Sequence, residues 1–221
     1  MQNNVYFISD LHFTHLNAMY YRPKRCESVG ISLDELRSGD KQEVADKHDK
    51  WLINLWNSRI HKYDTVYILG DFCLGNKIRT EYILNRLHGK KFLIRGNHDK
   101  SCNGLERYFV QVSDIKEAKF TNSEFPFINK EETFCVEMCH FPLLTWNRKS
   151  HGTVHIHGHS HGDIDDLNTE SKELRVDVGL DANLANYDFI SLETLYNYFV
   201  SLIQSEGCNT FQEYAIKRNI K

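Results

Sequence analysis

Three short apolar runs in the first half of the chain each lead into a polar residue. The runs and the residues that follow them are 5–9 with Asp10, 65–69 with Asp71, and 91–95 with Asn97. Continuous apolar runs of this length are typical of strands that are buried on both faces. Parallel strands end at the same edge of a sheet, so the sequence predicts that these polar side chains lie close together there.

Helical patterns separate the three runs. Between the first two, large side chains recur at spacings of three and four, as on one face of a helix, at Val44, His48, Trp51, Leu52, Leu55 and Trp56. Ile83, Leu84 and Leu87 indicate a shorter helix before the third run, and Ser32 with Glu35 has the spacing of a capping box. The alternation of strands and helices predicts a mostly parallel sheet in an α/β fold.

The second half of the chain is richer in strand patterns. Residues 133–139 alternate as a strand does, and residues 153–156 and 174–178 form further short apolar runs. An amphipathic pattern over residues 195–203 predicts a helix, and Thr210 with a Glu three residues later predicts the cap of a last short helix. The chain shows no internal repeat or Pro-rich linker, so we expect one domain over residues 1–221.

Composition narrows the class of protein. Hydrophobic residues make up 41% and charged residues 26% of the 221 residues, which is typical of a globular protein. The net charge of -3 provides no basic excess for nucleic acid, and we interpret the basic residues Arg22, Lys24 and Arg25 as solvated surface. Residues 1–6 lack an export signal, and we expect a cytoplasmic protein with reduced cysteines and no membrane insertion.

Five short motifs carry groups that can bind metal ions. In chain order they are Asp10-Leu11-His12, Gly70-Asp71, Gly96-Asn97-His98-Asp99, Cys139-His140 and Gly158-His159-Ser160-His161. Two divalent ions about 3.5–4 Å apart need several ligands and a carboxylate that bridges them. Mixed imidazole, carboxylate and amide ligands suit Mn, Fe, Zn, Co or Ni better than Ca, which prefers oxygen ligands.

These ordered motifs resemble those of the calcineurin-like metallophosphoesterase superfamily, and in particular its small stand-alone bacterial and phage enzymes. The resemblance implies an α/β fold in which a β-sandwich is flanked by helices on both outer faces, as four layers αββα. It also implies two divalent metal ions, with manganese the first choice. The implied ligands are Asp10, His12 and His161 for one ion, Asn97, His140 and His159 for the other, and Asp71 as the bridge.

The implied reaction is hydrolysis of a phosphate ester by water that bridges the two ions. We expect a small phosphodiester or a nucleotide-like substrate. His98 is outside the implied ligand set, and we predict that it stabilises the phosphoryl charge or protonates the leaving oxygen. We predict that Asp99 orients the His98 ring. Two alternatives stay open at this point, a nuclease that acts on DNA or RNA and a binding scaffold without turnover.

Several other residues allow a functional or a structural interpretation. His15 and Asn17 follow the first motif and could contact substrate phosphate or stabilise a turn. His155 and His157 share a strand face with His159, and we interpret them as packing residues. A predicted loop after His140 carries an aromatic ring and two cations that could contact a base and phosphates, namely Trp146, Arg148 and Lys149.

Overall fold

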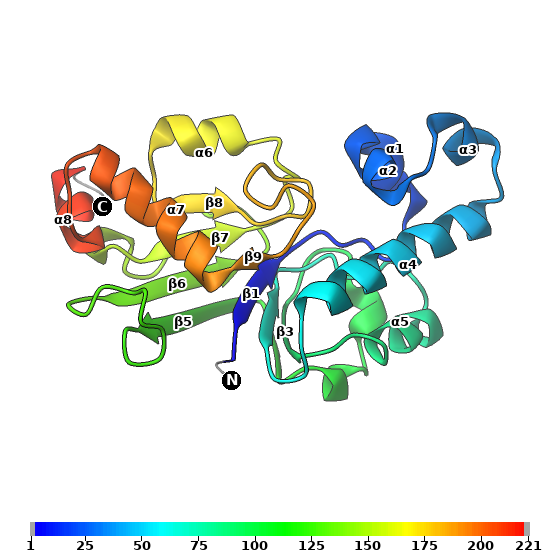
Figure 1. Ribbon diagram of the computed structural model, residues 1–221, viewed down its shortest axis with the longest axis horizontal. Helices are drawn as coiled ribbons and strands as arrows, with labels where there is room; N and C mark the ends of the chain where they lie inside the picture. The colour runs from blue at the N-terminus through cyan, green and yellow to red at the C-terminus, as the bar shows by residue number, and fades with distance from the viewer. Residues whose placement is uncertain (1–2, 219–221) are drawn as a thin grey trace.

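The strands of the protein form two sheets. The structure is a computed structural model that describes residues 3–218 (Figure 1). In the described chain, one sheet has the order β4-β3-β2-β1-β9, with β1 (Val5–Ile8), β2 (Thr65–Ile68), β3 (Lys90–Ile94), β4 (Gln111–Ser113) and β9 (Ile190–Ser191). The other sheet has the order β5-β6-β7-β8, with β5 (Ile115–Thr121), β6 (Thr133–Cys139), β7 (Val154–His157) and β8 (Arg175–Asp177).

Both sheets are mixed. Strands β1 to β4 pair in parallel and β9 joins the edge of β1 antiparallel, while β5 pairs antiparallel with β6 and the pairs β6·β7 and β7·β8 are parallel. The strands predicted at residues 5–9, 65–69 and 91–95 are confirmed as β1, β2 and β3. The sequence did not predict β4, β5 and β9, because β5 has a single fully buried residue and β4 and β9 have three and two residues.

The longer helices lie where the helical patterns are strongest. The helices are α1 (Leu16–Tyr21), α2 (Pro23–Val29), α3 (Leu33–Ser38), α4 (Lys41–Arg59), α5 (Lys77–Leu84), α6 (Asp165–Ser171), α7 (Leu192–Ser205) and α8 (Phe211–Lys217). Ser32 Oγ accepts the Glu35 N–H at 3.1 Å, and Thr210 with Glu213 forms the predicted capping box. The short helices α1, α2 and α6 were not predicted, since none has a long apolar stripe.

The first sheet buries both faces. On one face, Phe7 and Tyr67 stack with ring centroids 5.5 Å apart in the core that the two sheets share with α7 and α8. On the other face, Ile8 and Ile68 belong to the core that includes Trp56 of α4 and side chains of α5. Successive side chains along each strand point to opposite faces, so the apolar residues of the first sheet contribute to both of these cores.

On the outer face of the second sheet, the polar side chains of β7 and β8 are buried, and α6 covers part of this face (Figure 1). Asn168 of α6 lies between two of its side chains, with Nδ2 at 3.1 Å from His157 Nε2 and Oδ1 accepting from Arg175 Nε at 2.8 Å. His155 Nε2 accepts the Leu143 N–H at 3.1 Å. His155 and His157 therefore pack inside the structure as predicted, and the four-layer αββα fold is confirmed.

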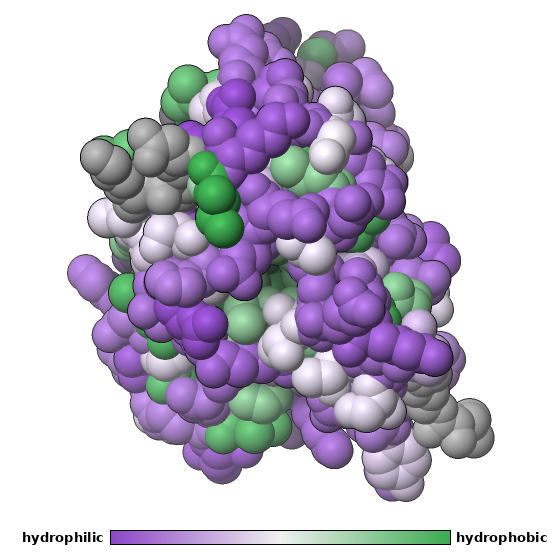
Figure 2. Space-filling view, turned by 90° about the vertical axis from the view of Figure 1, so that its left-hand side faces the viewer, coloured by the Kyte–Doolittle hydropathy of each residue, from purple (hydrophilic) through white to green (hydrophobic). Residues whose placement is uncertain are grey.

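The end of the molecule at α8 is mainly hydrophilic, and its apolar side chains are scattered (Figure 2). Among the described helices, none combines the length and the apolar character that a membrane crossing requires. In the described chain, buried apolar side chains form two clusters on the faces of the first sheet and a third, smaller cluster among α1 to α4.

One buried imidazole has no partner. His48 of α4 is fully buried and stacks on Trp51, and neither of its ring nitrogens has a hydrogen-bond partner among the residues that the structure describes. Burial lowers the pKa of His48 from 6.5 to about 3, because the charged ring would lose its hydration. Below pH 6.5, His48 therefore becomes protonated in the unfolded chain but stays neutral in the folded protein.

We expect His48→Leu to reduce the sensitivity of the fold to acid. Between pH 7 and pH 5 the wild-type histidine lowers the free energy of unfolding by ~2 kcal/mol, and the substitution removes this loss. Urea unfolding at both pH values measures the difference, with His151→Gln as a matched control at an exposed histidine. An equal loss of stability in wild type and His48→Leu would contradict the assignment.

Candidate metal centre

The loops after β1 and β2 are joined by main-chain hydrogen bonds at one edge of the first sheet. The N–H of Asp10 donates to the carbonyl oxygen of Gly70 at 3.1 Å, and the N–H of His12 donates to that of Asp71 at 2.9 Å. The two loops are therefore held side by side, and the polar residues that follow the strands become neighbours, as the sequence predicts.

Five of the predicted ligands have a left-handed backbone. Their φ angles are 58° for Asp10, 51° for His12, 50° for Asp71, 68° for His159 and 49° for His161. This conformation is uncommon for residues with a Cβ and costs about 1–2 kcal/mol for each. Strained residues of this kind cluster at sites where the direction of a side chain matters, which marks this edge as functional.

Two glycines permit the loops to approach each other closely. Gly70 has a φ of +90°, which favours glycine, and a Cβ there would lie 2.6 Å from His140 Nδ1. A Cβ at Gly96 would lie 2.3 Å from Oδ1 of Asp71. A side chain at either position would therefore displace a predicted ligand.

Asp71 lies between two groups of side chains. Its Oδ2 is 3.7 Å from His12 Nε2, and its Oδ1 is 3.6 Å from His140 Nε2. His140 Nε2 is in turn 3.0 Å from Oδ1 of Asn97. One carboxylate thus faces ligands of both predicted sets.

Asp10 belongs to the same cluster. Its Oδ1 is 3.9 Å from His12 Nε2 and 3.7 Å from His161 Nε2. Its Oδ2 accepts the main-chain N–H of His159 at 3.0 Å. Ligand atoms within 4.8 Å of one another form two candidate groups, Asp10 with His12 and His161, and Asp10 with Asp71 and His140.

The chemistry of these atoms fits a cation. Oδ1 of Asp10 is buried without a hydrogen-bond partner among the described residues, and burial raises the pKa of Asp10 to about 6. Burial, and next the charge of Arg25, hold the pKa of His12 well below its ordinary value, so this ring is neutral. Its Nε2 lies 3.1 Å from Nε2 of His161, close enough for both nitrogens to bind one cation.

In His140 and His161, the hydrogen bond made by Nδ1 determines that Nε2 faces the candidate metal centre. Nδ1 of His140 lies 2.7 Å from the carbonyl oxygen of Leu69, and Nδ1 of His161 lies 2.7 Å from Oδ2 of Asp181. Carbonyl and carboxylate oxygens accept, so in each ring Nδ1 carries the proton and Nε2 is left free to bind a metal. The sequence analysis did not single out Asp181.

Arg25 was interpreted as solvated surface, and this interpretation is wrong. The side chain, on α2, is fully buried. The cost of burying its charge is offset because its guanidinium binds Asp181 through two hydrogen bonds, including Nε to Oδ1 at 2.9 Å. Burial raises the pKa of Asp181, but Arg25 and His161 outweigh it and lower that pKa below its ordinary value. No local pattern could reveal this pair, since its members are 156 residues apart.

The structure gives Asp99 a role that differs from the predicted one. Its carboxylate accepts three main-chain N–H groups instead of orienting the His98 ring, from Asp71 at 3.0 Å, Phe72 at 2.8 Å and Gly96 at 2.7 Å. A buried carboxylate can satisfy loop N–H groups that lie outside regular structure. Asp99 therefore holds the loop that carries Asp71.

A pocket of about 260 Å³ opens at the cluster. It is lined by His98 and His15, by Tyr21 and Arg22 from the helical segment α1–α2, and by five ligand candidates, His12, Asp71, Asn97, His159 and His161. The Tyr21 side chain is 77% exposed, so its ring is available at the pocket. Of the two residues for which a phosphate contact or a turn role stayed open, His15 lines this pocket and Asn17 does not.

The loop with Trp146, Arg148 and Lys149 does not provide the predicted contacts with base and phosphate. Trp146 is buried and its Nε1 donates to the carbonyl oxygen of Thr153 at 2.8 Å. Lys149 is also buried, and its Nζ lies 2.7 Å from Oε1 of Glu173. Two of the three side chains are therefore engaged in packing, and Arg148 alone of them is exposed.

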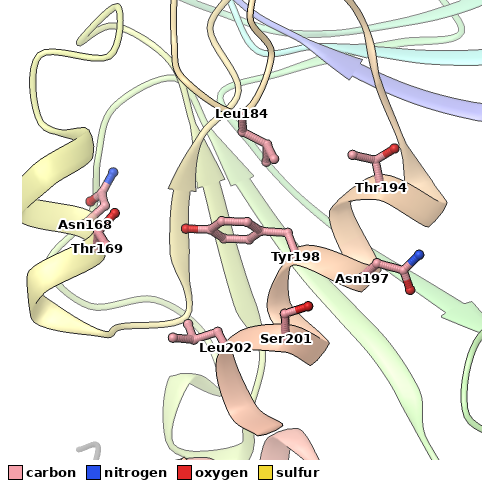
Figure 3. Close-up of a pocket in the computed structure, with 8 residues that line it drawn as sticks. All are labelled: Asn168, Thr169, Leu184, Thr194, Asn197, Tyr198, Ser201 and Leu202. Carbon is pink, nitrogen blue, oxygen red and sulfur yellow. The ribbon is translucent and has the colours of Figure 1, made fainter. Parts of the chain in front are cut away.

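A larger cavity of about 510 Å³ lies between α6 and α7, and the Tyr198 ring points into it (Figure 3). Its lining is uncharged and comprises Asn168, Thr169, Leu184, Thr194, Asn197, Tyr198, Ser201 and Leu202. This cavity has neither a carboxylate or imidazole ligand nor a cation for phosphate. The metal-binding chemistry of the described chain is therefore concentrated in the smaller pocket.

The protein is similar to several known proteins. It is 28% identical over 201 residues to the Gene 66 protein of Mycobacterium phage D29, covering 81% of this chain and 89% of that protein. It is also 28% identical over 197 residues to an uncharacterised protein of Methanocaldococcus jannaschii, covering 86% of this chain and 88% of that protein. A crystal structure of a protein of unknown function from Aquifex aeolicus shares the fold, with a TM-score of 0.60, 21% identity, and coverage of 89% of this chain and 100% of that chain.

The calcineurin-like phosphoesterase family matches this chain over residues 4–192, which includes every predicted ligand. This match confirms the resemblance that the ordered motifs indicate. Members of the family usually bind divalent metal ions, and the clustered Asp and His side chains are candidate ligands. The protein belongs to the calcineurin-like phosphoesterase family.

Proposed function

We propose that this protein is a binuclear metal-dependent hydrolase of small phosphodiesters or nucleotide-like phosphate esters. One ion is held by Asp10, His12 and His161, the other by Asn97, His140 and His159, and Asp71 bridges them. Manganese is the first choice among Mn, Fe, Zn, Ni and Co, since the ligands mix imidazole with oxygen. The unit of function is one domain over residues 1–221, of which residues 1–2 and 219–221 lie outside the described chain.

The observation that carries the proposal is the position of Asp71. Its two carboxylate oxygens face different histidines, His12 at 3.7 Å and His140 at 3.6 Å. A carboxylate that served a single ion would not need histidines on both sides. This arrangement supports two ions that share one bridging ligand.

Hydrolysis also needs a nucleophile, compensation of the phosphoryl charge and a proton for the leaving oxygen. Bound divalent cations supply an activated water nucleophile and offset the charge of the phosphoryl oxygens. His98 lines the pocket outside the ligand set, and its main-chain N–H donates to Oδ1 of Asp71 at 2.9 Å. This bond fixes the His98 backbone beside the bridge, which suits a ring that donates a proton to the leaving oxygen.

The size and walls of the pocket favour a small substrate. A volume of about 260 Å³ suits a phosphoryl group with a small substituent, and the exposed Tyr21 ring provides a surface for a base. A nuclease is the second candidate, favoured by the same ring, while Arg22 at the pocket is paired with Asp163 at 2.6 Å. The net charge of -3 favours the small ester over a nucleic acid.

We expect metal-stripped protein to hydrolyse bis-p-nitrophenyl phosphate after Mn is restored, and faster than p-nitrophenyl phosphate. Mn, Ni, Zn, Co and Mg are added separately, and release of nitrophenol is recorded for each. Plasmid and short oligonucleotides in parallel assays distinguish the nuclease. Two bound ions without turnover of any substrate would favour a binding scaffold instead.

Asp71→Asn removes the charge between the two ions, and we expect turnover to fall by at least about 100-fold. The matched control is Asp188→Asn, which changes a carboxylate that pairs with Arg59 on the surface. Rates with Mn and the number of bound ions are measured for both variants. Wild-type activity in Asp71→Asn would refute the bridging role.

His98→Ala should retain both ions and slow hydrolysis by roughly 10²–10⁴-fold for esters with poor leaving groups. Esters with good leaving groups need less protonation, so their rates should fall less. Metal analysis and rates for a series of aryl and alkyl esters test this. Loss of an ion, or an equal fall for all leaving groups, would show that His98 has another role.

A further inference from the structure

We propose that Arg25 is a positioning residue that assembles one half of the metal centre, the half formed by Asp10, His12 and His161. The inference rests on the proposed binuclear centre. Arg25 lies on α2, in a helical segment outside all five motifs. It reaches this half of the centre by two routes, one through a carboxylate and one through the main chain.

The first route leads to the ring of His161. The guanidinium of Arg25 binds both carboxylate oxygens of Asp181, and Oδ2 of Asp181 lies 2.7 Å from Nδ1 of His161. Arg25 thereby fixes the direction of the carboxylate that holds the ring. The opposite nitrogen, Nε2, then faces Asp10 and His12, where a metal is expected.

The second route leads to the loop after β1. Nη2 of Arg25 donates to the carbonyl oxygen of Asp10 at 2.8 Å, and Nη1 donates to that of Leu11 at 3.2 Å. Asp10 and His12 have positive φ angles, so this loop needs contacts that hold it in a strained conformation. Arg25 supplies two such contacts from a fully buried position.

The planar guanidinium is essential to this arrangement. It makes four hydrogen bonds at fixed angles, two to Asp181 and two to main-chain oxygens. A lysine has one compact ammonium group and cannot reproduce the bidentate contact together with both carbonyl contacts. A residue that only balanced the charge of Asp181 would not need to reach the carbonyl groups of Asp10 and Leu11.

The other half of the centre has supports of its own, and Asp10 touches it through the main-chain N–H of His159, which its Oδ2 accepts at 3.0 Å. His140 is oriented by the carbonyl oxygen of Leu69 at 2.7 Å, and the loop that carries Asp71 is held by Asp99. Within residues 3–218, Arg25 forms no hydrogen bond with Leu69, His140 or Asp99. Its removal should therefore weaken the ion of the Asp10 half more than the other.

Manganese titration of the full-length protein tests this selectivity. We expect two ions per wild-type chain, and in Arg25→Gln one retained ion and one bound about 10–100-fold more weakly. The paramagnetic resonance spectrum should change from a coupled pair to isolated Mn. Lys24→Gln is the matched control, an exposed neighbour on the same helix, and should resemble wild type.

Unchanged affinity for both ions in Arg25→Gln would overturn the inference, as would an equal loss of both in a chain that circular dichroism shows to be folded. A wild type that binds fewer than two ions would instead refute the binuclear proposal. Since Arg25→Gln leaves Asp181 buried without its cation, the double variant Arg25→Gln/Asp181→Asn keeps the test valid if the single variant unfolds. It should lose the same ion.

A second readout needs no metal. Long-range ¹H–¹⁵N spectra of the metal-free protein at pH 8 report which nitrogen of His161 carries the proton, and His161→Gln identifies the signal. We expect the proton on Nδ1 in wild type and in Lys24→Gln, and a mixture of tautomers in Arg25→Gln. A wild-type tautomer in Arg25→Gln would contradict the route through Asp181.

Discussion

The main-chain hydrogen bonds at one edge of the first sheet are the interactions on which the rest of the site depends. Buried carboxylates such as Asp10 and Asp71 are costly to keep together without compensation. The bonds from Asp10 to Gly70 and from His12 to Asp71, with the three N–H groups that Asp99 accepts, hold the loops in this arrangement. Such internal bonds reduce the share of an ion's binding energy that is needed to order the loops.

The parts of the fold that follow from local patterns could be predicted. The strands that end at Ile8 and Ile68 are continuous apolar runs, and α4 has large side chains at helical spacing, so each is recognisable in a short window of sequence. Polar residues directly after such strands meet at one edge because parallel strands share a direction. The gathering of Asp10 and Asp71 within one cluster agrees with that argument, and His140 joins them from the end of β6 in the other sheet.

The parts that depend on distant partners could not be predicted. Arg25 is indistinguishable from a surface arginine until the fold brings Asp181 to it. Asp99 was assigned to its sequence neighbour His98, yet its partners are N–H groups of Phe72 and two other loop residues. Trp146 follows a predicted ligand in the chain but turns into the core. Proximity in sequence was a poor guide wherever a side chain reaches across loops.

The wide separation of the ligands along the chain has a consequence for how the protein is made. His12 and His161 are 149 residues apart, and Arg25 and Asp181 are 156 residues apart. A chain that leaves the ribosome from its N-terminal end exposes Asp10 and His12 well before their partners are synthesised. A complete centre exists only after most of the domain has emerged, so the full set of ligands can close around an ion only late in synthesis.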